Sequence, residues 1–85
     1  MNELLGTYPN PAQSRATVRY ALPERQEVSL TLYDVLGRQV RTLVRGEQAG
    51  RHKRRVDVGN LASGVYFLRL RTEGQTRTQK LTVVR

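Results

Sequence analysis

The chain has 85 residues with no cysteine and one histidine, and its formal net charge is +8 at pH 7. This length supports one domain with one modest core, and the lack of cysteine excludes disulfides and thiolate chemistry. No apolar run is long enough for a membrane span, and no signal peptide opens the sequence.

The first third of the chain alternates apolar and polar residues in short segments, which is the pattern of half-buried strands. A proline-rich bend at residues 8–11 includes Tyr8, whose ring we expect to anchor on the first strands. A turn is predicted at residues 23–26. The strands predicted in this part cover residues 4–5, 15–22 and 27–33.

Residues 34–38 predict a loop in which Gly37 takes a positive φ and the Asp34 carboxylate accepts backbone hydrogen bonds. Val35 and Leu36 also lie in this loop, and we expect at least one of them to fold back on the core. Residues 39–44 fit both a helical turn and a bulged strand, and the β neighbours favour the strand.

The segment 61–71 begins with a turn and then carries apolar residues on both strand faces from Val65 to Leu68. A strand of this kind lies inside a sheet, so we expect it to be the central strand. The other elements predicted in this part are a two-glycine loop at 45–50, strands at 51–58 and 76–84, and a hairpin turn at 73–75.

About seven short strands, with turn signals about every 8–12 residues and no convincing helix, predict an all-β fold. The architecture that this spacing favours is a two-sheet antiparallel sandwich of immunoglobulin-like type. The residues predicted to form its core are Val18, Tyr20, Leu22, Val28, Leu30, Leu32, Val56, Tyr66, Leu68, Leu70, Leu81 and Val83.

The side chains that catalysis and metal binding need are absent or scattered. Ser63 lacks a nucleophile-elbow sequence, and His52 would be its only base. One histidine without cysteine cannot form a zinc site, the acidic residues do not cluster as in a calcium loop, and no glycine-rich phosphate loop occurs. We therefore predict no enzymatic activity, no metal and no cofactor.

The basic residues form the strongest charge feature, with thirteen Arg against two Lys. Such a field attracts nucleic acid, anionic lipid headgroups or acidic polysaccharide, although a GC-rich or thermophilic genome accounts for the Arg excess equally well. On a strand, Arg51, Lys53 and Arg55 form a stripe that could contact an anionic ligand.

The stripe has no aromatic residues interleaved with it, so nucleic acid is an unlikely partner. A solvated edge strand that blocks edge-to-edge pairing is the favoured alternative for the stripe. Val65 and Phe67 form a second candidate contact patch, for which cover by a neighbouring loop is the favoured alternative.

Five motifs, in this order and spacing, make the chain from residue 7 to residue 85 similar to a known family. They are YPNP at residues 8–11, LYDVLGRQV at 32–40, GRH at 50–52, LASGVYF at 61–67 and KL at 80–81. The chain resembles the C-terminal sorting domain of the type IX (Por) secretion system of the Bacteroidetes group. A related sandwich occurs in flagellar hook-capping proteins.

The resemblance implies that residues 1–85 are a single sorting domain at the C-terminus of a larger exported protein. An N-terminal signal takes the parent across the inner membrane, and the outer-membrane translocon then recognises this domain in the periplasm. A surface sortase removes the domain and joins the cargo to an anionic lipopolysaccharide, or the cargo is released. The expected locations are the periplasm in transit, then the outer-membrane surface or the extracellular space.

The resemblance also implies which residues the translocon recognises. By motif position these are Gly64, Tyr66, Lys80, Leu81 and Val83, to which the terminal Arg85 adds a free carboxylate. Val56 stands where the family often has Trp, so this position stays apolar but fills less space.

We expect the last strand to lie at a sheet edge with unpaired backbone groups, available for strand addition or capture of the terminal carboxylate. The competing hypothesis is a glycan- or surface-binding accessory domain that uses the basic stripe.

Overall fold

The computed structural model describes residues 3–84, which form one antiparallel sheet of five strands without a helix. The strands are β1 (Glu3–Tyr8), β2 (Arg15–Asp34), β3 (Gln39–Asp57), β4 (Gly64–Thr72) and β5 (Gln75–Val83). The all-β antiparallel prediction is therefore confirmed, as are the strand interpretation of residues 39–44 and the turn between β4 and β5.

Two strands are much longer than predicted, β2 with 20 residues and β3 with 19. Their pairing continues through the polar stretches 23–26 and 45–50, where Gln26 pairs with Gln48. Within these two stretches the register is interrupted at residues 23–25, which lie opposite Ala49, and this bulge bends the two strands together. The prediction of a turn at residues 23–26 and a loop at residues 45–50 is wrong. It failed because a strand bend exposed to solvent has the same polar composition as a loop.

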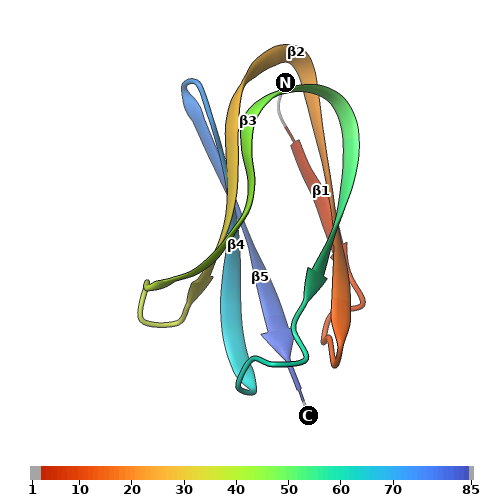
Figure 1. The fold of residues 1–85 in the computed structure, drawn as a ribbon, viewed down its shortest axis with the longest axis vertical. Helices are drawn as coiled ribbons and strands as arrows, with labels where there is room; N and C mark the ends of the chain where they lie inside the picture. Colours follow the sequence, from red (N-terminus) through yellow and green to blue (C-terminus); the bar gives the residue numbers. More distant parts are fainter. Residues whose placement is uncertain (1–2, 85) are drawn as a thin grey trace.

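The bend folds one sheet into two facing layers, as Figure 1 shows where β2 and β3 arch over one end of the molecule. The first layer contains β1, the first half of β2 and the second half of β3. The second layer contains the other halves of β2 and β3 together with β4 and β5. The predicted separation into two sheets is wrong: the sheet is a single curled half-barrel, because neither long strand breaks at the bend.

The glycine at the bend helps to explain why β3 can continue there. Gly50 pairs with Leu22 at the last position before the bulge and has a φ of 89°. A residue with a side chain rarely adopts this backbone conformation. On the open side of the half-barrel, Arg41 Nη1 donates to the carbonyl oxygen of Asp57 at 2.7 Å, which joins the two ends of β3.

β4 lies between β2 and β5, which confirms that this segment is an interior strand. Its inward residues pair with inward residues of β2, Leu70 with Leu30 and Leu68 with Leu32. All twelve residues predicted for the core are buried, and Val56 is only 1% exposed. The core also contains Ala12, Ala16, Leu43, Val44 and Val58.

Replacing Leu32 with Ala should leave a cavity at the centre of the second layer, because Leu32 is fully buried against β4. We expect a loss of about 2–5 kcal/mol in the free energy of unfolding. Urea unfolding measures this loss. Ser29→Ala, on the outer face of the same strand, should change stability by no more than about 0.5 kcal/mol. Equal effects of the two substitutions would contradict the assignment of the core.

Candidate recognition surface

A segment between β1 and β2 lies along the outer edge of β5. The backbone nitrogen of Ala12 donates to Thr82 O at 2.8 Å, and that of Val84 donates to Ala12 O at 2.9 Å. Asn10 adds two bonds: its Nδ2 donates to Lys80 O and its Oδ1 accepts from the Thr82 nitrogen, each at 3.0 Å. We call residues 9–12 the strap. The peptide bonds before Pro9 and Pro11 are cis.

The strap limits which backbone groups at the edge of β5 are available to a partner. β5 is a terminal strand of the sheet, as predicted. However, the backbone of its second half is already paired with the strap, so the prediction of an unpaired edge is wrong there. In the described part of the chain, the first half of β5 has only a side-chain contact on this side, from Thr7 Oγ1 to Gln79 Oε1 at 2.5 Å. Among the described residues, only the first half of β5 leaves edge backbone groups with which an added strand could pair.

The predicted recognition residues differ in how far they reach the surface. Tyr66, Leu81 and Val83 are buried, with exposed fractions of 8%, 0% and 1%. Gly64 and Lys80 are exposed, and Arg85 lies outside the described residues. Their role in recognition stays a prediction. Within the described set, only Gly64 and Lys80 present surface that a partner of the folded domain could contact.

The buried Tyr66 has a structural task in addition to packing. Its hydroxyl donates to the carbonyl oxygen of Ala62 at 2.6 Å, so the ring holds the loop that precedes β4. The same loop contains a turn in which the Leu61 nitrogen donates to Val58 O at 3.1 Å. The start of β4 therefore has a fixed position relative to the core.

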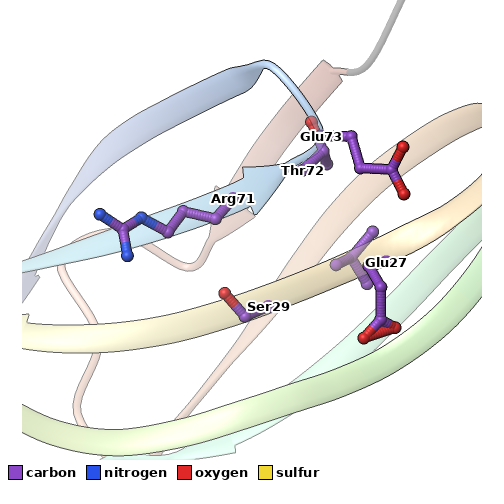
Figure 2. Close-up of a pocket in the computed structure, with 6 residues that line it drawn as sticks. Glu27, Ser29, Arg71, Thr72 and Glu73 are labelled. Atoms are coloured by element: carbon purple, nitrogen blue, oxygen red, sulfur yellow. The ribbon is translucent and has the colours of Figure 1, made fainter.

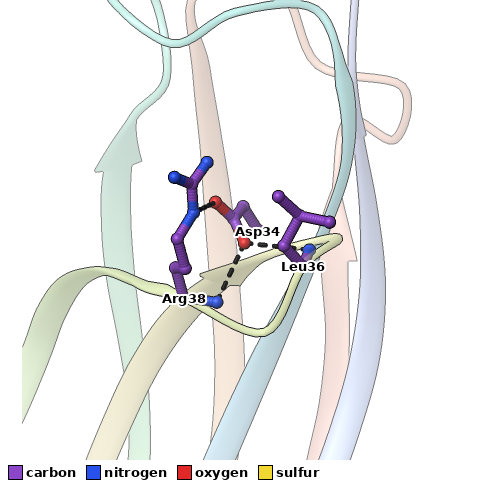
Figure 3. A network of polar contacts seen from close by, with 3 residues as sticks. All are labelled: Asp34, Leu36 and Arg38. Atoms are coloured by element: carbon purple, nitrogen blue, oxygen red, sulfur yellow. Dashed lines mark hydrogen bonds and ion pairs between the residues drawn. The ribbon is translucent and has the colours of Figure 1, made fainter.

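The tip of the β2–β3 hairpin is closed by the carboxylate of Asp34 (Figure 3). Oδ1 accepts from the backbone nitrogens of Leu36 at 3.0 Å and Arg38 at 2.9 Å, while Oδ2 accepts from Arg38 Nε at 2.9 Å. Gly37 has a φ of 83°, and its nitrogen donates to Asp34 O at 3.0 Å. The predicted roles of Asp34 and Gly37 are confirmed.

Val35 and Leu36 are exposed at this tip, with exposed fractions of 67% and 74%. The expectation that one of them folds back on the core is wrong. The hydrogen bonds of Asp34 keep the loop short and closed, so its backbone cannot bend back far enough to place either side chain against the sheet. We call Val35 and Leu36 the apolar tip. The sequence DVLG contains these two residues but does not indicate that their side chains point into solvent.

The register brings four distant motifs to one end of the second layer. Asp34, Tyr66 and Leu81 form one row across β2, β4 and β5. The apolar tip follows Asp34 directly, and the strap binds the backbone from Lys80 to Val84 at this same end. In Figure 1 the start of β4 and the end of β5 lie at the lower end of the molecule, and the tip loop projects to the left above them.

The Asp34 carboxylate has a pKa below its ordinary value of 3.8. The main cause is the hydrogen bond from the backbone N–H of Arg38. The guanidinium of Arg38 and the N–H of Leu36 act in the same direction, and partial desolvation acts against them. The bonds that fix the tip are therefore strongest when Asp34 is ionised.

The predicted basic stripe lies on the outer face of the first layer, where Arg51, Lys53 and Arg55 are all exposed. On the opposite face of the same strand, the His52 ring stacks on Tyr20 with ring centroids 5.2 Å apart. Burial raises the pKa of Tyr20, whose hydroxyl donates to Gln48 Oε1 at 2.6 Å. His52 and Tyr20 thus support the strand, and anion binding by the stripe stays a prediction.

Val65 and Phe67 are half-buried on the outer face of the second layer, where Arg69 lies 4.6 Å above the centre of the Tyr33 ring. A shallow pocket nearby is lined by Glu27, Val28, Ser29, Arg71, Thr72 and Glu73. Figure 2 shows the Arg71 side chain extending away from the two carboxylates. The only histidine of the chain lies in the other layer, so Ser29 has no imidazole base here.

Residues 3–84 contain no group of three or more His, Asp or Glu side chains placed to hold a metal ion. They also contain no helix that could cross a membrane.

The comparisons with known proteins identify a family and a similar fold. The sequence profile of the family described as "Secretion system C-terminal sorting domain" matches residues 6–84. No curated protein sequence matches the chain. The crystal structure of dimeric latent PorU from Porphyromonas gingivalis is similar, with a TM-score of 0.76 and 22% identity over 98% of this chain. The match covers 9% of that chain, and at this identity it shows a shared fold.

Asn10→Ala should release the strap from β5, because it removes a donor to Lys80 O and an acceptor from the Thr82 nitrogen. We expect a loss of about 1–2 kcal/mol in stability and faster hydrogen exchange at the Thr82 amide. NMR-detected exchange measures the second effect. Gln13→Ala, on an exposed neighbour, is the matched control. Unchanged protection of Thr82 in Asn10→Ala would show that the strap does not hold the edge.

The lowered pKa of Asp34 predicts a pH dependence of the tip. Because the pKa is lower in the folded state, Asp34 stabilises the fold above its unfolded pKa, and this contribution is lost as the pH falls through the folded pKa. Carboxyl NMR titration should give Asp34 a midpoint below 3.8. Asp34→Asn should remove this component of the acid dependence, whereas Glu73→Gln should not. Identical acid unfolding of wild type and Asp34→Asn would contradict the assignment.

Proposed function

Since the chain belongs to the family of secretion system C-terminal sorting domains, we propose that the outer-membrane translocon of the type IX (Por) system binds its folded form. The domain is a secretion signal for a cargo protein, with no catalytic role of its own. The observation that carries the proposal is the convergence of the strap, the apolar tip, the start of β4 and the end of β5 at one end of the second layer.

The proposal assigns different tasks to the exposed and the buried motif residues. Tyr66, Leu81 and Val83 hold the ends of β4 and β5 in place from the core. Gly64, Lys80 and Arg85 are the recognition groups on the β4–β5 side. The apolar tip is a further contact, because Val35 and Leu36 are highly exposed and the Asp34 bonds hold their backbone before any partner binds.

The proposal also extends to the fate of the cargo. The domain is the C-terminal module of a larger exported protein, with the cargo domain upstream. A surface sortase removes the domain and attaches the cargo to an anionic lipopolysaccharide, or the cargo is released. The protein accordingly passes through the periplasm to the outer-membrane surface or the extracellular space. The match to a small part of a much longer chain supports this modular arrangement.

Export of a reporter tests the proposal in a host with an active type IX system. A monomeric reporter with an N-terminal signal and this domain at its C-terminus should reach the cell surface or the medium. Deletion of residues 76–85 should leave the reporter in the periplasm. Val35→Ser combined with Leu36→Ser should reduce export about tenfold or more, because it removes the apolar contact and leaves the core intact.

The control for the tip variant is Glu24→Ser combined with Arg25→Ser at the exposed bend of β2, which should be exported normally. Circular dichroism of each purified domain verifies folding. Normal export of the deletion variant would overturn the sorting role. Normal export of the folded tip variant would overturn the assignment of the apolar tip as a contact.

A further inference from the structure

We propose that the outer face of the first layer binds an acidic glycan chain, at a site separate from the end of the second layer where the strap, the apolar tip and the ends of β4 and β5 lie. The face is built by β1, the first half of β2 and the second half of β3. Five cations from two of these strands lie on it: Arg15, which is paired opposite Asp57, and Arg19, Arg51, Lys53 and Arg55, which are paired opposite no acidic residue. We call the last four residues the cationic face.

The arrangement of the cationic face is unfavourable for the fold alone. Arg19 is paired directly opposite Lys53, and like charges at such positions repel each other. The acidic residues of this face, Glu3 and Asp57, pair with Ala21 and Arg15 at its two ends. Within residues 3–84, none of the four cations takes part in an ion pair or a side-chain hydrogen bond. A bound polyanion would relieve the repulsion between them.

Four arginines outside the cationic face have structural partners. Arg25 pairs with Glu47, Arg38 pairs with Asp34, and Arg41 bonds Asp57 O. Arg69 stacks over the Tyr33 ring. The four residues of the cationic face have no such partner within residues 3–84, and their charges lie together on two paired strands.

An exposed aromatic ring shares this face. Tyr8 pairs with Thr17, whose other neighbour is Arg55, and Tyr8 is 47% exposed. The next row contains Gly6, Arg19 and Lys53, and a side chain at Gly6 would meet nothing within 4 Å. The surface directly above Gly6, in the row of Arg19 and next to the row of Tyr8, is therefore open.

These groups match the chemistry of an acidic sugar. The apolar face of a sugar ring packs on Tyr8, and its carboxylate, sulfate or phosphate groups bind Arg19, Lys53 and Arg55. Tyr8 and Arg55 are two strand spacings apart, about 10 Å, so the site accommodates several rings of a linear chain. Arginine also offers two parallel donors to each anionic group.

The same observations disfavour single-stranded nucleic acid. Its binding sites stack successive bases on several aromatic residues. Among the described residues, Tyr8 is the only aromatic on this face, because Tyr20 points into the core and Tyr33 and Phe67 lie on the second layer. One ring in a row of cations is better suited to a charged sugar than to a run of bases.

Titration calorimetry of the 85-residue chain with a heparin-derived octasaccharide tests the proposal. We expect binding that weakens with salt, and no binding of a neutral maltose octamer. Arg19→Gln with Lys53→Gln should weaken binding about tenfold or more and lower the salt slope by about two. Tyr8→Leu should weaken binding about threefold to tenfold without changing the salt slope. Each variant is verified as folded by circular dichroism.

The matched control is Arg45→Gln with Arg71→Gln, two cations that flank Ser29 on the outer face of the second layer. This variant has the same net charge as the first and should bind almost as well as the wild type. If both double variants weakened glycan binding equally, net charge alone would explain the effect, and the proposed site would be wrong. Tighter binding of an oligothymidylate of equal charge would overturn the glycan assignment. Reporter export by Arg19→Gln with Lys53→Gln should be normal, so the site and the sorting role fail independently.

Discussion

The continuous pairing of β2 with β3 through their common bend is the constraint on which the rest of the structure depends. The register is interrupted by three residues of β2 opposite one of β3 and then resumes at Gln26 and Gln48. Because both strands bend together, each contributes inward residues to two layers, and one core forms between the layers. The outer faces of the two layers then become separate surfaces, and the cationic face lies on the first layer, away from the strap and the apolar tip at the end of the second.

Local pattern was sufficient to predict twelve residues of the core, because the period of two in each strand segment does not depend on how the strands are paired. It could not distinguish a bend from a loop, since residues 23–26 and 45–50 are polar in either case. Ala12 and Ala16 gave no signal because small residues contribute little to alternation. The strap was also invisible, since Asn10 bonds to residues 70 and 72 positions away.

The candidate site shows the same limit. Motif position identified Tyr66, Leu81 and Val83 without indicating that they support the surface from within. Asp34 and Gly37 were predicted correctly from residue type, whereas the direction of Val35 and Leu36 depends on how tightly the loop closes. The basic stripe was visible in the sequence, but Arg19 and Tyr8 join it only through the pairing of β1, β2 and β3.

The strap joins residues near the beginning of the domain to residues near its end. A ribosome delivers Asn10 and Ala12 early, yet their partners on β5 are among the last residues of the domain to emerge. A polypeptide that stops short of β5 leaves these early residues without their bonds and cannot complete the surface at that end. A protein whose synthesis stops before β5 therefore lacks a complete export signal.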